Sequence, residues 1–279
     1  MLRSATAFIL LAACSARAAP PVPESEAQSE QSPFEVDLVL DLGITLGSLV
    51  VLGASRLFVG EFSGPACGLD CRPQDVNWLD RQVIGKRSAA SDMASDIGAA
   101  SAMALPFLLG AIDTLVSGPG DGWTGYAKDS LVLAETLSLT LGLNNTLNFI
   151  VRRPRPFAYD GAVDAERRLE AESAMSFPSG HTSASFAMAT AYSYMYMRRH
   201  PDSPLVAPIW LGTHALACAV GVLRTEAGEH FYTDVLAGAA LGVGLGLLVP
   251  WLHERRTASR ISISPTAVPG GLALALTIR

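Results

Sequence analysis

The sequence predicts an all-α, membrane-embedded bundle of six helices, whose functional core is formed by the last four to five helices. Apolar residues make up 49% of the 279 residues, whereas charged residues reach only 16%, against about 25% in ordinary soluble domains. The charges cluster between long uncharged runs, and none of these runs has the period-2 alternation of a membrane barrel. The formal net charge of −6 argues against a nucleic-acid partner.

The uncharged runs are separated by turns rich in Gly, Pro, Asp and Arg, and none of them contains Asp, Glu, Lys or Arg. They cover residues 42–55, 97–112, 136–151, 181–197, 204–223 and 235–252. Crossing a bilayer takes about 20 mainly apolar residues. The last two runs meet this requirement outright, and the first is the weakest candidate.

The chain ends are expected to lie outside the helical domain, which we place at residues 37–253. Residues 1–18 have the layout of a secretory signal, either cleaved after the Ala-Arg-Ala at 16–18 or processed as a lipoprotein signal with Cys14 acylated. Residues 19–36 form a flexible acidic lead-in. In the tail, residues 254–279, two alternating runs around Pro269 predict a short β-hairpin.

The four cysteines show no CxxC pair and no zinc-like Cys/His spacing, so no structural metal site is expected. Cys67 and Cys71 lie in the loop GPACGLDCRP. A short disulfide can form there in an oxidising compartment, and two unpaired thiols are the alternative.

Small and polar residues inside the apolar runs are interpreted structurally. Gly238, Gly242 and Gly246 recur at every fourth position and should let another helix approach closely. Glu135 must be paired or protonated, although the sequence identifies no partner for it. His253, beside two arginines at the end of the last run, is expected to be an interface residue.

Three polar clusters lie at the ends of apolar runs. They are RRPRP at 152–156, SFPSGHTS at 176–183 and RTEAGEHFYTD at 224–234. Because successive membrane helices alternate in direction, the end of the third helix, the start of the fourth, the end of the fifth and the start of the sixth all meet at one face. The three clusters should therefore form a single site.

The residue types in these clusters are suited to phosphate. Arg155 and Arg224 supply guanidinium forks, which match phosphate oxygens. Ser179 and Gly180 at a helix start offer backbone N–H groups and the positive end of the helix dipole.

Two histidines, His181 and His230, join the cluster. Asp234 follows His230 by four residues, which should place its carboxylate on the same helix face. A carboxylate bonded to one ring nitrogen would leave the other nitrogen free as a nucleophile.

Taken together, these motifs resemble the signature of the type-2 phosphatidic acid phosphatase and vanadium haloperoxidase superfamily, which also includes class A acid phosphatases. The resemblance rests on Pro178-Ser179-Gly180-His181, on Arg224 with His230 and Asp234, and on Arg155-Pro156, and it covers about residues 90–252.

The resemblance implies a role for each of these residues. His230 would attack phosphorus and form a phosphohistidine, Asp234 would orient His230, and His181 would protonate the leaving oxygen. The equatorial oxygens would be held by Arg155, Arg224 and the backbone of Ser179-Gly180, with no metal ion or other cofactor.

Two positions depart from the family pattern. Asn148 stands where the family has a Lys seven residues before Arg155, and Leu223 replaces the Ser before Arg224. We call the positive groups that would hold the phosphate oxygens, Arg155 and Arg224 among them, the clamp. Loss of one cation from the clamp would cost about 2–4 kcal/mol of transition-state stabilisation. Arg152 or Arg153 is expected to compensate, the alternative being a catalytically weak homologue that only binds phospholipid.

The resemblance and composition together imply a phosphatase in a bacterial-type inner membrane, with its site facing the periplasm and a lipid-linked phosphomonoester or pyrophosphate as substrate. The alternative is a periplasmic or lipid-anchored acid phosphatase acting on soluble phosphoesters. The sequence allows both orientations of the site in the membrane. A cleaved signal followed by six crossings puts the site in the cytoplasm. Five crossings after a cleaved signal, or six crossings with an uncleaved N-terminus, put it outside. The sequence does not indicate an oligomeric state.

Overall fold

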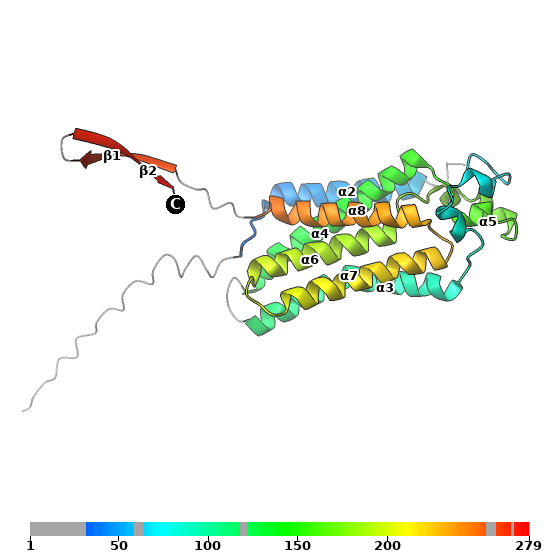
Figure 1. The fold of residues 1–279 in the computed structure, drawn as a ribbon, viewed down its shortest axis with the longest axis horizontal. Coiled ribbons are helices and arrows are strands. Elements are labelled where there is room, and N and C mark those ends of the chain that lie inside the picture. Colours follow the sequence, from blue (N-terminus) through cyan, green and yellow to red (C-terminus); the bar gives the residue numbers. More distant parts are fainter. Residues whose placement is uncertain (1–31, 59–63, 118–121, 255–260, 269–270, 279) are drawn as a thin grey trace, which may run out of the picture. The chain divides into compact units, whose positions relative to one another are not determined.

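The computed structural model describes residues 32–58, 64–117, 122–254, 261–268 and 271–278. Six long helices run side by side in this part of the chain, which confirms the predicted all-α bundle (Figure 1). They are α2 (Leu38–Phe58), α3 (Ala89–Ser117), α4 (Gly122–Val151), α6 (Gly180–Arg199), α7 (Val206–Glu226) and α8 (Tyr232–Leu252).

Four of these helices, α2, α3, α7 and α8, are long and apolar enough to cross a membrane. On α2 the large apolar side chains point outward, with Val39 86% and Val50 68% exposed. Water does not favour such a surface, whereas lipid does. Helices α4 and α6 carry more polar side chains and bury many of them against other helices.

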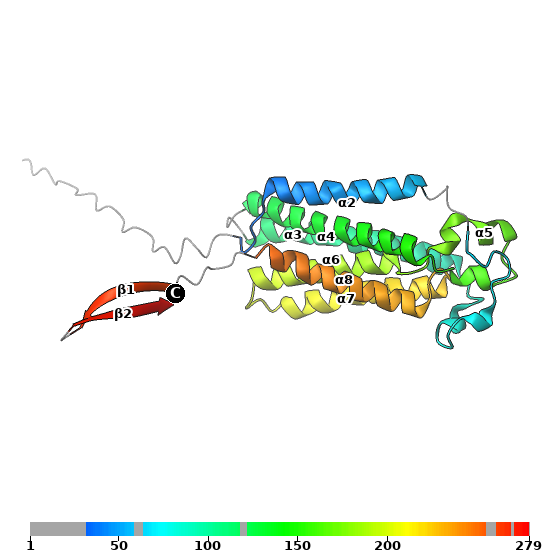
Figure 2. The same cartoon turned by 90° about the horizontal axis from the view of Figure 1, so that it is seen from above.

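Helix α6 lies at the centre, against α3, α4, α7 and α8, while α2 packs on α4 at one edge of the bundle (Figure 2). The predicted glycine stripe forms the contact between α8 and α6. A Cβ atom on Gly238 would lie 2.7 Å from the Ser179 carbonyl oxygen, and one on Gly246 would lie 2.6 Å from that of Ala187. Larger residues would push these two helices apart, so the packing role expected for the stripe is confirmed.

One end of the bundle is covered by the connecting segments. The segment before α3 contains short 3-10 helices at Pro73–Asp75 and Asp80–Val83, and the α4–α6 connection contains α5 (Ala165–Leu169). At this end α4 and α7 finish and α3, α6 and α8 begin, which is the convergence predicted from the alternating helix directions.

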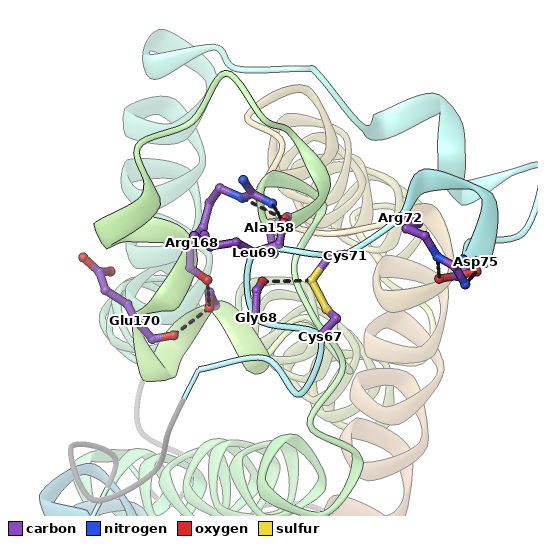
Figure 3. Close-up of a disulfide and its surroundings, with 10 residues drawn as sticks. Cys67, Gly68, Leu69, Cys71, Arg72, Asp75, Ala158, Arg168 and Glu170 are labelled. Carbon is purple, nitrogen blue, oxygen red and sulfur yellow. Dashed lines mark hydrogen bonds and ion pairs between the residues drawn. A yellow bond between two sulfur atoms is a disulfide. The ribbon is translucent and has the colours of Figure 1, made fainter.

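A disulfide joins Cys67 to Cys71 in the first of these connections (Figure 3). Arg168 of α5 ties this loop to the second connection. Its Nε donates to the carbonyl oxygen of Ala158 at 3.0 Å and its Nη2 to that of Leu69 at 2.8 Å. The disulfide therefore belongs to the end of the bundle where the polar clusters meet.

The packed part of the chain begins earlier than the predicted boundary at residue 37. Phe34 is fully buried in the core, and it pairs with Glu254 in an isolated β-bridge. The last residues of the expected acidic lead-in therefore pack against the end of α8. The predicted signal at 1–18, including Cys14, lies outside the described residues.

The tail forms the predicted hairpin. Strands β1 (Ile261–Val268) and β2 (Gly271–Ile278) pair antiparallel, with Ile261 opposite Ile278.

Candidate active site

A cavity of about 110 Å³ opens at the end of the bundle where the three motifs meet. Six of the predicted site residues line it, and they come from α4, the connection after it, α6, α7 and the turn before α8. The full lining is Asn144, Asn145, Asn148, Arg155, Glu172, Met175, Pro178, Gly180, His181, Arg224 and His230.

His230 lies in the turn between α7 and α8 and is only 3% exposed. Its Nδ1 donates to the main-chain oxygen of Ser176 at 2.8 Å. A carbonyl oxygen can only accept, so Nδ1 carries the hydrogen and Nε2 keeps its lone pair in the neutral ring.

The surroundings of His230 disfavour its protonation. Burial removes the charged imidazolium from water, and the positive charges of Arg155 and Arg224 add to this effect. Together they lower the pKa of His230 well below its ordinary value of 6.5. The ring is therefore neutral at physiological pH, which is the state a nucleophile needs.

Asp234 does not hydrogen-bond His230, contrary to the role expected for it. The two residues do not share a helix face, because α8 begins only at Tyr232 and His230 lies in the preceding turn. Asp234 Oδ2 lies 4.0 Å from His230 Nδ1 and instead accepts from Ser176 Oγ at 2.5 Å and from Phe231 N at 2.9 Å. Asp234 thus positions Ser176, whose carbonyl in turn positions His230.

His181, in the first turn of α6, faces an acidic residue that the sequence analysis did not single out. Its Nε2 lies 2.9 Å from Asp96 Oδ1 on α3. With Nε2 donating to this carboxylate, Nδ1 is the nitrogen that can act on a substrate.

The two clamp arginines are held by carboxylates. Arg224 is 4% exposed and donates to Asp92 Oδ1 at 2.6 Å. Arg155 donates to Glu229 Oε2, and the same oxygen lies 3.5 Å from Arg224 Nη2. Glu229 also accepts from Arg167 at 2.6 Å, so three guanidinium groups surround one buried carboxylate.

The turn before α6 only partly supports the expected backbone cradle. Gly180 lines the cavity, but Ser179 does not. The N–H of Ser179 donates to the main-chain oxygen of Asp234 at 3.1 Å. Ser179 therefore joins the second motif to the third, and its N–H is not directed at a phosphate.

Asn148 lines the cavity at the position where the resemblance led us to expect a Lys, and its amide hydrogens are used within the protein. Nδ2 donates to the main-chain oxygens of Asn144 at 3.0 Å and Pro178 at 3.2 Å. Asn148 thus braces the loop that carries Gly180 and His181.

Neither arginine expected to replace the absent cation is placed to do so. Arg152 is not among the lining residues. Arg153 donates to Asp234 Oδ1 at 2.5 Å and to Asp80 Oδ2 at 2.8 Å. Arg153 therefore fastens the third motif to the segment before α3, which corrects the expectation of compensation.

Asp80 completes this anchor. Its side chain is fully buried and also accepts from the backbone and hydroxyl of Thr233 at 3.0 and 2.6 Å. Burial alone would raise the pKa of Asp80, but the hydrogen bonds from Thr233, Arg153 and Asn77 outweigh burial and lower it. The carboxylate is therefore charged in the folded protein.

Sequence reasoning missed the acidic partners of the site. Asp92 and Asp96 are four residues apart, directly before the run at 97–112. The alternation of helix directions places this point at the same face as the three motifs, so that signal could have found them. Glu229 stands beside His230 inside a cluster already identified, but no spacing rule marks it as the partner of three arginines.

Comparisons with known proteins agree with the motifs. Residues 129–258 match the model of the PAP2 superfamily. The lipid A 1-phosphatase of Porphyromonas gingivalis is 30% identical over 141 residues, 48% of this chain and 27% of that protein. Phosphatidylglycerophosphatase B of Bacillus subtilis is 32% identical over 139 residues, 49% of this chain and 64% of that protein.

A third relative is the bacitracin transport permease protein BcrC of Bacillus licheniformis, 33% identical over 126 residues, 45% of this chain and 53% of that protein. The chain thus spans less than two thirds of the length of these relatives. A solved structure, a transmembrane PAP2 type phosphatidylglycerolphosphate phosphatase from Bacillus subtilis, aligns with a TM-score of 0.48 and 21% identity, covering 79% of this chain and 98% of that chain. The segment that matches the PAP2 superfamily model, residues 129–258, contains both histidines and both arginines that line the cavity.

Proposed function

We propose that this protein is a membrane phosphatase that hydrolyses a lipid-linked phosphomonoester or pyrophosphate through a phosphohistidine on His230. The observation that carries the proposal is the convergence, in one cavity, of a buried neutral histidine, two arginines and a second histidine paired with a carboxylate. Such a set supplies a nucleophile, a binding site for phosphate oxygens and a general acid.

In the first step, Nε2 of His230 attacks phosphorus and forms a P–N bond while the bond from phosphorus to the leaving oxygen breaks. The Ser176 carbonyl accepts a hydrogen bond from Nδ1–H throughout this step and stabilises the positive ring. Nδ1 of protonated His181 gives its proton to the leaving oxygen, and Asp96 keeps this ring in place.

In the second step, His181 takes a proton from water as the water oxygen attacks phosphorus. The P–N bond breaks, His230 returns to its neutral state and inorganic phosphate leaves. Arg155 and Arg224 neutralise the charge that spreads over the equatorial oxygens in both steps. The proposed chemistry needs no metal ion, so we expect initial rates to be unchanged by EDTA.

The apolar surface of the bundle supports a lipid substrate over a soluble one. A groove of about 440 Å³ between α2, α4 and α8 is lined almost entirely by carbon. Its α4 residues Gly142 and Thr146 lie two positions from Asn144 and Asn148 of the phosphate cavity, so the groove opens on a different face of α4. The groove therefore supports a lipid environment around the protein, in which a lipid-linked phosphate is the accessible substrate.

The disulfide supports a periplasmic site. Disulfides persist in oxidising compartments and are rare in the cytosol. Cys67 and Cys71 lie in the connection that also carries Asp80, which binds the third motif through Arg153 and Thr233. The cavity and the disulfide therefore share one side of the membrane.

The proposal is tested by phosphate release from purified protein in detergent. The panel contains phosphatidic acid, phosphatidylglycerol phosphate, undecaprenyl pyrophosphate and a soluble aryl phosphate, with His230→Gln as the inactive control. Release from at least one lipid at a higher kcat/KM than from the aryl phosphate is expected. Preference for the aryl phosphate would favour the soluble-substrate alternative, and phospholipid binding without release would favour the non-catalytic one.

A further inference from the structure

A second cluster of titratable groups is buried in the helical bundle, away from the phosphate cavity. It consists of Asp41 on α2, Glu135 on α4 and His253 directly after α8. Asp41 and Glu135 are each 4% exposed. One ligand atom from each residue lies within 4.8 Å of the others.

This cluster is separate from the phosphate site. His253 follows the last residue of α8, whereas His230 precedes the first. With a rise of about 1.5 Å per residue, the length of α8 puts about 30 Å between the two ends. Glu135 likewise lies about 20 Å along α4 from Asn148, by the same rise.

The distances within the cluster suit a shared cation better than hydrogen bonds. His253 Nε2 lies 3.4 Å from Asp41 Oδ2 and 3.5 Å from Glu135 Oε2. These separations exceed the 2.7–3.2 Å that is usual for N–H···O bonds. Ligand atoms on a tetrahedral zinc ion, at about 2.0–2.1 Å from the metal, lie about 3.3 Å apart.

The other nitrogen of His253 favours the same interpretation. Nδ1 lies 2.8 Å from the main-chain oxygen of Val249, which can only accept a hydrogen. In the neutral ring Nε2 therefore presents a lone pair to the two carboxylates. Metal-ligating histidines commonly hold their second nitrogen in this way.

Buried oxygens in the cluster also make no hydrogen bond. They are Oδ2 of Asp41, Oε2 of Glu135 and, one helical turn after Asp41, Oγ1 of Thr45. Burying two carboxylates without compensation is costly, and such groups are normally paired or bound to a metal. A divalent cation would neutralise both charges and satisfy both oxygens.

We propose that Asp41, Glu135 and His253 bind a divalent cation of the zinc class, with Thr45 beside the remaining coordination position. One nitrogen and two carboxylate oxygens are ligands that zinc accepts. The ion would join α2 to α4 and α8. Because α2 packs mainly on α4 at the edge of the bundle, this bond would fasten the most peripheral helix (Figure 2).

The site is tested first by metal analysis of the full chain, purified in detergent without an affinity tag and dialysed against zinc. We expect one zinc ion per chain in the wild type and at least about 100-fold weaker zinc binding in Glu135→Gln and in His253→Ala. His200→Ala is the matched control, because His200 makes an ordinary 2.9 Å pair with Asp113. No bound zinc in the wild type, or equal binding by all three variants, would overturn the proposal.

A second measurement uses only the wild type and so does not depend on the variants folding. Zinc added to metal-stripped protein should raise the Tm, and a strong chelator should lower it again. An unchanged Tm in both directions would mean that no metal binds between the two carboxylates and would overturn the proposal. Since the phosphate cavity lies at the other end of α8, the initial rate of phosphate release should not follow zinc occupancy.

Discussion

His230 donates an Nδ1–H hydrogen bond to the main-chain oxygen of Ser176 at 2.8 Å, and the Ser176 hydroxyl in turn donates to Asp234 at 2.5 Å. This arrangement fixes the tautomer of the proposed nucleophile, His230, through a backbone carbonyl. The carboxylate acts one residue further away, where it holds Ser176 Oγ, the start of α8 and Arg153.

The pH dependence of the reaction should reflect the environment of His230. Burial, Arg155 and Arg224 lower the pKa of His230 well below 6.5, so the reactive neutral ring is lost only when the pH falls well below that value. The acid limb of kcat/KM assigned to His230 should therefore lie well below pH 6.5. A pH–rate profile from pH 4 to 9 with a limb at pH 6.5 that is retained in His181→Gln would contradict this assignment.

The effect of removing the proposed general acid, His181, on kcat should depend on the leaving group. His181→Ala should lower kcat by about 10²–10⁴-fold with a lipid alkyl phosphate, and much less with a nitrophenyl ester, whose leaving oxygen needs no proton. Asp96→Asn should show the same pattern in weaker form, because Asp96 holds His181 at 2.9 Å.

The control for this comparison is Asp70→Asn, a residue of the disulfide loop that does not line the cavity. It should leave both substrates unaffected. An equal loss with both substrates for His181→Ala would show that His181 does not protonate the leaving group.

The position of Asn148 predicts a gain of function. Asn148→Lys would restore a cation at the cavity wall, and we expect kcat/KM to rise about tenfold, within the 2–4 kcal/mol that one charged donor can supply. Arg152→Ala should change kcat/KM little, because Arg152 does not line the cavity. A large loss in Arg152→Ala together with an inert Asn148→Lys would restore the compensation hypothesis.

Arg153, unlike Arg152, is expected to affect the stability of the fold. Arg153→Ala would leave the buried carboxylates of Asp80 and Asp234 without their shared partner, a loss of about 3–5 kcal/mol of unfolding free energy. Arg72→Ala breaks only an exposed pair with Asp75 and should cost no more than about 1 kcal/mol. Thermal unfolding of the two variants in detergent measures both losses of unfolding free energy.

Glu229 should compete with the substrate for the clamp. Its carboxylate binds Arg155 and Arg167 and lies 3.5 Å from Arg224, so a bound phosphate meets a negative charge beside both clamp arginines. Glu229→Gln should therefore tighten inhibition by vanadate about tenfold at low salt. Glu226→Gln, which alters only the exposed pair with Lys86, is the control, and weaker vanadate binding in Glu229→Gln would show that Glu229 aligns the arginines instead.

The fold followed from the sequence because its signals are local. Apolar runs bounded by turn residues gave six helices, and the glycine stripe gave the close contact between α8 and α6. The exact start of α8 was not predictable, and a two-residue difference there removed the expected contact between His230 and Asp234.

The candidate site was predictable where a motif marks its residues, and not where distant segments supply partners. The three motifs and the alternating helix directions predicted that Arg155, Arg224 and both histidines would line one cavity. The Asp80–Arg153 anchor and the cluster of Asp41, Glu135 and His253 join segments far apart in sequence, so no spacing reveals them. Glu135 was recognised as needing a partner, but only the packing of α2 and α8 identifies one.

The central claim is that His230 becomes covalently phosphorylated. The most direct test mixes the protein with a ³²P-labelled lipid phosphate and stops the reaction rapidly without acid. We predict a base-stable, acid-labile label on the peptide containing His230, formed faster than phosphate is released and absent from His230→Gln. His181→Ala should still accept the label when the substrate carries a nitrophenyl leaving group. Label on a different peptide, or steady turnover with no labelled enzyme at any time point, would contradict the account.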